Sequence, residues 1–213
     1  MPQSPLARAL LIFAIGFAVL MTGALAWQWN RMSQQSTATS GGTTASGTAL
    51  IGGPFELLDQ NGELRRESDF AGRNMLIYFG YTYCPDVCPS SLSVMTQALD
   101  ILEERAPQKA QIIAPIFITV DPERDTVEAM KSYAEHFHPD MVALTGSSEQ
   151  VAQAAKAYRV YYAKAEDEAS GDYLMDHSSF IYLMGPDGSY LTHFAHNATP
   201  DSIAEDLERY VGS

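Results

Sequence analysis

The 213-residue sequence predicts an α/β domain in which buried strands alternate with helices. Two short apolar runs, Met75–Gly80 and Ile112–Val120, are typical of buried strands. The segment between them, Ser90–Arg105, repeats apolar residues at intervals of three and four, as an amphipathic helix does. Strands joined through such helices favour a sheet with crossover connections.

The remaining elements follow from turn and cap signals. Asn61-Gly62 between two short runs predicts a hairpin that pairs Phe55–Asp59 with Glu63–Arg65. Cap residues and apolar runs predict the rest, in chain order: a helix Asp125–Phe137 capped by Asp121 or Asp125, a strand Met141–Leu144, a helix from Ser147 or Ser148 to about Tyr158, a strand Arg159–Ala163, two strands Ser179–Met184 and Tyr190–Phe194 around a Gly185–Gly188 turn, and a helix Pro200–Val211.

The first fifty residues differ from the rest of the chain. Residues 9–29 carry no charge, and as a helix they would rise about 31 Å, enough to cross a bilayer core. We expect a tail over 1–8, a transmembrane anchor over 9–29, a flexible linker over 30–50 and a folded domain over 51–213. The alternative for the apolar run is a signal peptide cleaved at Ala24–Ala26.

Charge and cysteine content exclude several classes of protein. Residues 51–213 hold all 26 acidic residues and 11 of the 13 basic ones, a formal net charge of −15, so no nucleic-acid partner is expected. Two cysteines are too few for a disulfide-stapled scaffold or a four-cysteine zinc site. Any function of the cysteines must therefore depend on a single pair.

That pair, Cys84 and Cys88, follows the predicted strand that ends at Gly80 and begins the next helix. Residues four apart on a helical turn share a face, with Cβ atoms about 5–6 Å apart, which suits two thiolates on one metal or a disulfide. A helix N-terminus also stabilises a thiolate. Three interpretations stay open here: a local structural disulfide, thiol–disulfide exchange and metal binding.

A two-cysteine metal site needs a further donor, and five histidines are available. His136 and His138, at a predicted helix end, are expected to be solvent-exposed. His193 and His196, three apart near the last strand, offer at most a weak surface site. His177 precedes an apolar strand, where polar residues often belong to sites, although spacing alone equally allows an ordinary loop histidine.

Five stretches, YFGYTYCPDVCP, TVDPERDT, YRVYY, DYLMDHS and IYLMGPDG, make the sequence resemble the Sco/SenC family of copper-binding proteins over roughly Gly53–Val211. The resemblance implies a thioredoxin-like fold with an added N-terminal β-hairpin, preceded by one transmembrane helix. It implies that Cys84, Cys88 and His177 bind one copper ion, as Cu(I) or Cu(II). It also implies a role in assembling the dinuclear copper centre of cytochrome c oxidase.

Neighbours of His177 have expected roles within this resemblance. Asp176 is the candidate acceptor for the second ring nitrogen of His177, because a metal-bound histidine usually donates its other N–H. Met175 is either a soft auxiliary donor or a core residue. Expected partners are the copper-bearing subunit of cytochrome c oxidase, other copper chaperones or thiol reductants, and the membrane. The expected location is the bacterial inner membrane, single-pass, with the soluble domain in the periplasm.

Three functions remain in competition. The first is a metallochaperone, which is not an enzyme in the usual sense. The second is a thiol–disulfide oxidoreductase whose redox-active pair Cys84 and Cys88 reduces the copper-ligand cysteines of the oxidase subunit, and the third is a redox or copper sensor. The three-residue gap between the cysteines, and the absence of proline from Asp172–Ser179, depart from thioredoxins and favour metal binding over a general reductase.

Overall fold

The structure is a computed structural model that describes residues 51–167 and 172–212. The predicted anchor over 9–29 and linker over 30–50 lie outside these residues. Across the described part of the chain, no helix combines the length and apolar character needed to span a bilayer.

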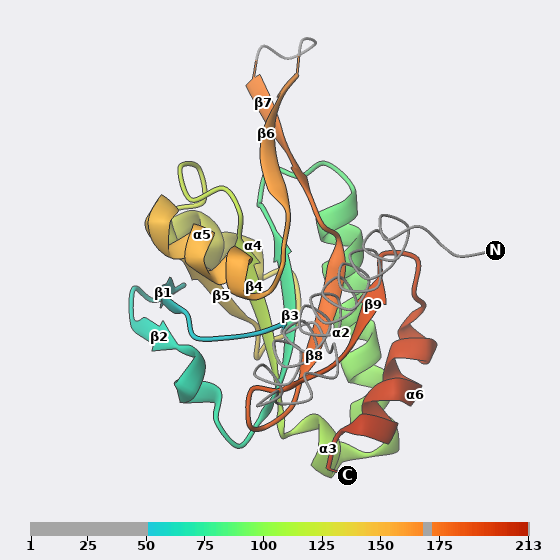
Figure 1. The fold of residues 1–213 in the computed structure, drawn as a ribbon. Helices are drawn as coiled ribbons and strands as arrows, with labels where there is room; N and C mark the ends of the chain where they lie inside the picture. Colours follow the sequence, from blue (N-terminus) through green and yellow to red (C-terminus); the bar gives the residue numbers. More distant parts are fainter. Residues whose placement is uncertain (1–50, 168–171, 213) are drawn as a thin grey trace, which may run out of the picture. The chain divides into compact units, whose positions relative to one another are not determined.

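A seven-stranded sheet forms the centre of the domain, in the order β2-β1-β5-β4-β3-β8-β9 (Figure 1). Its middle strands β3, β4 and β5 are parallel, and β1, β8 and β9 each pair antiparallel with a neighbour. The predicted N-terminal hairpin is present as β1 with β2 at one edge. The bounds are β1 Glu56–Asp59, β2 Leu64–Arg66, β3 Asn74–Gly80, β4 Ile113–Thr119, β5 Val142–Thr145, β8 Phe180–Met184 and β9 Tyr190–Ala195.

Every residue of β3 and of β4 is buried. Parallel strands are covered on both faces, so their sequences read as continuous apolar runs instead of alternating patterns. The two strands pair without a shift along their whole length, from Asn74 opposite Ile113 to Gly80 opposite Thr119. The two runs that predicted the fold class are therefore the central strands, and the end of β3 leads into the cysteine segment.

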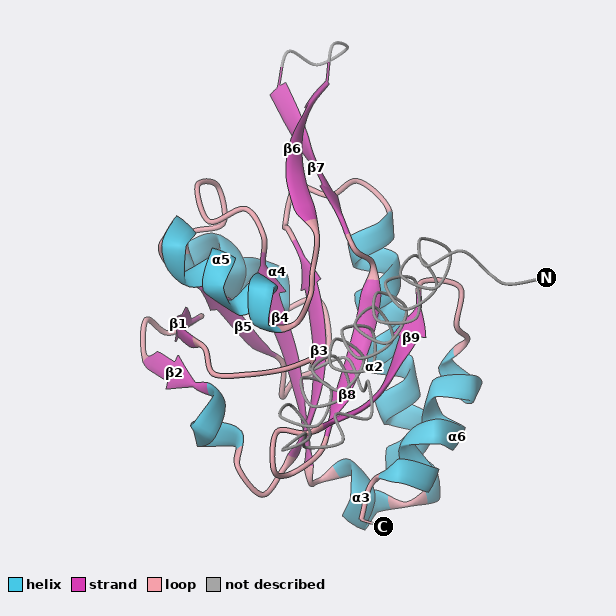
Figure 2. Cartoon of the chain, in the orientation of Figure 1, coloured by secondary structure: helices cyan, strands magenta, loops and turns pink. Residues whose placement is uncertain are grey.

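Helices pack around this sheet (Figure 2). Helix α2 buries the apolar face that its spacing predicted and packs against α6, whereas α4 contacts β5 and α5 contacts β1. Ser147 caps α5 as expected, with its hydroxyl accepting from the Gln150 N–H. The bounds are η1 Glu67–Phe70, α2 Val87–Arg105, α3 Pro107–Ala110, α4 Val127–Ala134, α5 Ser148–Ala157 and α6 Pro200–Tyr210.

Two expectations about boundaries were wrong. The cap of α4 is Thr126, whose hydroxyl accepts from the Ala129 N–H, and neither Asp121 nor Asp125 serves there because both carboxylates have other partners. Arg159 lies outside the strand predicted to begin with it, in a left-handed conformation with φ of 58°.

The strand after Arg159 instead belongs to a separate two-stranded hairpin. Strand β6, Tyr162–Asp167, pairs antiparallel with β7, Asp172–His177, and places Tyr162 opposite His177. Figure 1 shows this hairpin projecting beyond the ends of the central strands. His177 is therefore the last residue of β7, a strand that was not predicted, and not a loop residue.

Candidate metal centre

The structure brings Cys84, Cys88 and His177 together. The two Sγ atoms and one ring nitrogen all lie within 4.8 Å of one another. Cys88 Sγ is 3.3 Å from His177 Nε2. Among the described residues, this is the one group of three or more His, Cys, Asp or Glu side chains with spacing suited to a metal ion.

The cysteines owe their geometry to a turn that joins β3 to α2. The Cys84 N–H donates to the Tyr81 carbonyl at 3.3 Å, and the Cys88 N–H approaches Cys84 Sγ at 3.4 Å. Cys88 lies in the first turn of α2 and is fully buried, whereas Cys84 is half-buried; both thiols are free. The predicted strand-to-helix junction is thus observed, with the first helical turn directing a backbone N–H at the sulfur of Cys84.

The two thiols differ in acidity because they interact with each other. A hydrogen bond from the Cys88 thiol, with a further contribution from His177, lowers the pKa of Cys84 to about 3 against the opposing effect of burial. The neighbouring Cys84 thiolate and burial raise the pKa of Cys88 above its ordinary value. These opposite shifts favour the thiolate at Cys84, the less buried of the two sulfurs.

His177 presents one ring nitrogen to the cysteines. Its Nδ1 lies 3.1 Å from the Ser178 carbonyl, which can only accept, so Nδ1 carries a proton and Nε2 is the ring nitrogen that faces the thiols. The rings of Tyr78 and Tyr81 meet the imidazole edge-on, with centroids at 6.1 and 5.9 Å. This orientation leaves Nε2 as the nitrogen that can coordinate a metal.

The two residues before His177 have different environments. Asp176 is exposed, and because successive residues of a strand point to opposite faces, its side chain diverges from that of His177. The Ser178 carbonyl occupies the position where a carboxylate acceptor was expected, and the role of Asp176 stays a prediction. Met175 is buried in the apolar core, in agreement with the packing alternative.

The other four histidines lie away from this group. His136 is exposed, and its Nδ1 donates to the Ser132 carbonyl, while Nδ1 of His138 accepts from the Asp140 N–H. His193 and His196 are both exposed, and Nδ1 of His193 pairs with the Tyr190 hydroxyl.

The buried carboxylate of Asp125 accepts hydrogen bonds from the segment that precedes the cysteines. Asp125 is fully buried and accepts from the Thr82 hydroxyl at 2.6 Å, the Thr82 N–H at 3.1 Å and the Thr119 hydroxyl. These bonds join the turn after β3 to the end of β4, and burial raises the pKa of Asp125. Sequence reasoning considered Asp125 only as a helix cap; the available signal was an acidic cluster directly after an apolar strand.

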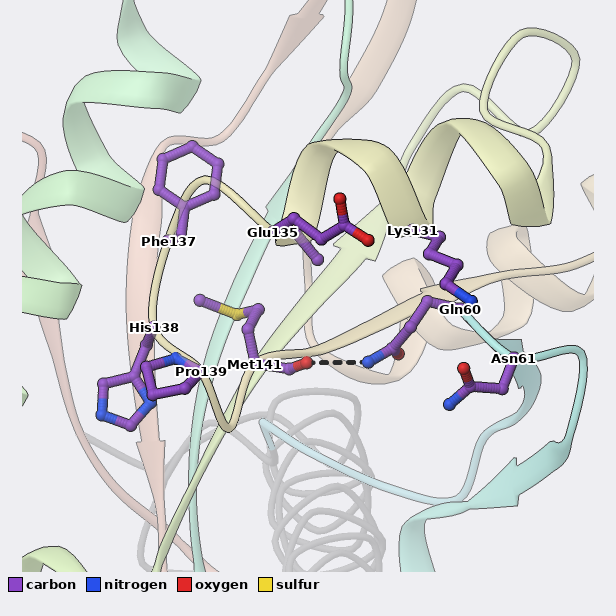
Figure 3. Close-up of a pocket in the computed structure, with 9 residues that line it drawn as sticks. Gln60, Asn61, Lys131, Glu135, Phe137, His138, Pro139 and Met141 are labelled. Atoms are coloured by element: carbon purple, nitrogen blue, oxygen red, sulfur yellow. Dashed lines mark hydrogen bonds between the residues drawn. The ribbon is translucent and has the colours of Figure 1, made fainter.

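A cavity lies elsewhere, between the end of α4 and the β1–β2 turn (Figure 3). Its volume is about 350 Å³, and Gln60 crosses it to donate to the Met141 carbonyl at 2.9 Å. Lys131, Glu135 and His138 also line it, but neither cysteine nor His177 does. It is therefore separate from the candidate metal centre.

Sequence comparison places this arrangement among known proteins. Residues 43–212 match the sequence model of the SCO1/SenC family. The chain belongs to this family. It is 40% identical to the mouse "Protein SCO2 homolog, mitochondrial" over 209 residues, 98% of this chain and 78% of the relative. It is 45% identical to a "SCO2-like protein" of Rickettsia felis over 159 residues, 74% of this chain and 76% of the relative.

Solved Sco structures share the fold. Arabidopsis thaliana ScoI with copper bound superposes with a TM-score of 0.70 at 41% identity, covering 75% of this chain and 96% of that one. Bradyrhizobium japonicum ScoI with copper bound gives 0.68 at 43% identity, covering 76% of this chain and 99% of that one. These similarities confirm the predicted thioredoxin-like α/β fold.

Proposed function

We propose that this chain is a copper metallochaperone that holds one copper ion through Cys84, Cys88 and His177. The observation that carries the proposal is the convergence of two thiols and one imidazole within 4.8 Å. The copper-bound ScoI structures, at 41% and 43% identity, support the choice of metal. The receiving site is then the dinuclear copper centre of cytochrome c oxidase, on its copper-bearing subunit.

The donor set suits copper as a cargo. Thiolates are soft ligands that favour Cu(I), and with an imidazole they also accept Cu(II). Three protein donors leave room for a ligand from a partner, so copper can pass by stepwise exchange. Cys84 is half-buried whereas Cys88 is fully buried, which makes Cys84 the donor more accessible to an incoming ligand.

An anaerobic Cu(I) titration against a competing chelator tests the three-ligand site. One copper per chain is expected, and His177→Ala should weaken affinity by at least the roughly 10-fold to 100-fold typical of losing a ligand's outer-shell partner. His193→Ala, which removes an exposed imidazole outside the group, is the matched control. Unchanged affinity in His177→Ala would refute the site.

Metal identity needs a second measurement, because zinc accepts the same ligands. A Cu(II) form with a thiolate-to-copper charge-transfer band is expected to lose that band in Cys84→Ser. Retention of the band, or preferential zinc binding under competition, would contradict the copper assignment.

A second function is favoured by the thiols themselves. The pKa of Cys84 is lowered and that of Cys88 is raised, which favours one nucleophilic sulfur beside a protonated one, as in a dithiol reductant. The pair would pass two electrons to a disulfide between the copper-ligand cysteines of the oxidase subunit and become a disulfide itself. One Sco relative of known structure, at 26% identity, is described as having a disulfide switch. Reduction of such a partner should be abolished by Cys88→Ser and preserved by His177→Ala.

We also propose that residues 9–29 anchor the domain to the bacterial inner membrane, with residues 51–213 in the periplasm. The uncharged run over 9–29 and the following linker, in which Arg31 is the one charged residue, support this arrangement. Retention in carbonate-washed membranes, with the domain digested by protease added to spheroplasts, is the expected result. Release as a soluble processed form would instead favour the cleaved signal peptide.

A further inference from the structure

The placement of His177 beside the cysteines needs an explanation. His177 ends β7, and β6 with β7 form a sheet that is not hydrogen-bonded to the seven-stranded sheet. Cys84 and Cys88 are held by the turn and helix that follow β3. Two residues link His177 to β8, which pairs with β3, so the backbone brings His177 near the cysteine turn. Side-chain contacts then orient the imidazole against the thiols.

The most extensive of these contacts centre on Arg124, in the turn after β4. Its guanidinium lies 3.7 Å from the centroid of the Tyr173 ring, 4.8 Å from that of Tyr83 and 5.8 Å from that of Tyr81. Nη1 donates to the Tyr173 carbonyl at 3.0 Å, and Nε donates to Asp121. The Tyr173 hydroxyl donates to the other oxygen of Asp121 at 2.8 Å.

These contacts join the three segments that build the site. Tyr81 and Tyr83 precede Cys84, whereas Tyr173 lies on β7 four residues before His177 and so on the same face of the strand. The Tyr81 ring touches both sides, since it also meets the His177 imidazole at 5.9 Å. The Arg124 side chain is only 15% exposed and that of Asp121 1%, so water screens the cluster little.

We infer that Arg124 is a positioning residue that fixes His177 against Cys84 and Cys88 by packing its guanidinium between the tyrosines of the cysteine turn and Tyr173 of β7. The inference rests on the proposed three-ligand copper site. A planar guanidinium is suited to this role, because it stacks on rings while its N–H groups bond in fixed directions. Arg124 itself donates no ligand atom.

Arg124→Met is the direct test. Anaerobic Cu(I) affinity is expected to fall about 10-fold to 100-fold, as for other residues that orient a metal ligand. Arg105→Met is the matched control, because it removes an arginine of an exposed ion pair with Asp201. Since Arg124→Met also leaves the buried Asp121 without this cation, Tyr173→Leu is a second variant that keeps the Arg124–Asp121 pair and removes the ring.

Two further readouts separate positioning from a general loss of structure. In the metal-free reduced protein, Arg124→Met and Tyr173→Leu should shift the NMR signals of the His177 ring away from their positions beside Tyr78 and Tyr81, and Arg105→Met should not. In a His177→Ala background, Arg124→Met should change copper affinity by no more than about twofold, because its effect passes through the imidazole.

The outcomes distinguish this inference from the proposed function. If the unmodified protein binds no copper, or binds it independently of His177, the three-ligand site is wrong. If the protein binds copper through His177 but both variants retain wild-type affinity and unshifted His177 signals, the positioning role alone is overturned. Equal losses of affinity with and without His177 would also overturn it.

Discussion

Gly80 ends β3 at the point where the sulfur of Cys88 packs against the strand. A Cβ built there would lie 2.9 Å from Cys88 Sγ, 2.9 Å from Tyr78 Cε1 and 3.2 Å from Phe117 Cε2. We predict that Gly80→Ala both destabilises the fold and weakens copper binding, because the added methyl group displaces one of the three ligand atoms.

The size of the effect follows from these contacts. Ordinary contacts between a carbon atom and its neighbours are about 3.5 Å or longer, so the two atoms at 2.9 Å must each move away from the new Cβ by about 0.6 Å. Tyr78, Phe117 and Cys88 are all fully buried and have no solvent to move into. Overpacking of this kind typically costs about 1–3 kcal/mol of the free energy of unfolding.

Urea unfolding of the metal-free protein measures the stability change, and an anaerobic Cu(I) titration measures the change at the site. Gly185→Ala is the control, because its nearest contacts are the ends of the exposed side chains of Ser189 and Asp187, which can rotate away. A Gly80→Ala protein with wild-type unfolding midpoint and copper affinity would refute the reasoning.

Three further predictions concern single side chains. Because the pKa of Cys84 is lowered to about 3, its alkylation rate in the reduced metal-free protein should vary by less than about twofold between about pH 5 and pH 8. In the urea-unfolded chain the rate should fall steeply on acidification. The same steep fall in the folded protein would contradict the prediction. Asp125→Ala leaves the buried Thr119 hydroxyl and the two partly buried donors of Thr82 without their acceptor, and should lower the free energy of unfolding in urea by about 1–3 kcal/mol. Asp100→Ala, at an exposed helix position, should not. Ser147→Ala removes the cap of α5 and should cost about 1 kcal/mol, seen as a lower Tm; an unchanged Tm would count against the cap.

The central fold was predictable because its signals are local. Strands β3 and β4 are buried on both faces, so their apolar runs are continuous, and α2 shows a clear helical period. The predicted strand Arg159–Ala163 overlaps β6 only at Tyr162 and Ala163, and β7 was not predicted, because the hairpin has many charges and no long apolar run. Apolar and charged residues alternate in Ala163–Glu166, and such alternation is itself a strand signal of period two.

The site was predictable only in part. Cys84 and Cys88 are four positions apart in the sequence, so one short turn is enough to bring them together. Cys88 and His177 are 89 residues apart, and no spacing rule relates them; the resemblance to a family supplied that pairing. Arg124 carried no signal of its own, because its role depends on rings from two other segments meeting around it.

This division of the site has a functional consequence. The contact between the thiols is fixed within a short turn, whereas the contact between thiol and imidazole also requires the end of β7, outside the seven-stranded sheet, to meet that turn. Thiol exchange needs only the first contact, and three-ligand copper binding needs both. Substitutions at the Arg124 cluster should therefore reduce copper affinity while leaving the Cys84–Cys88 pair able to form a disulfide. Copper affinity and disulfide formation, measured in the same variants, would separate the two proposed functions. If the variants that lose copper affinity but still form the disulfide are defective in oxidase assembly in cells, the role is metal delivery.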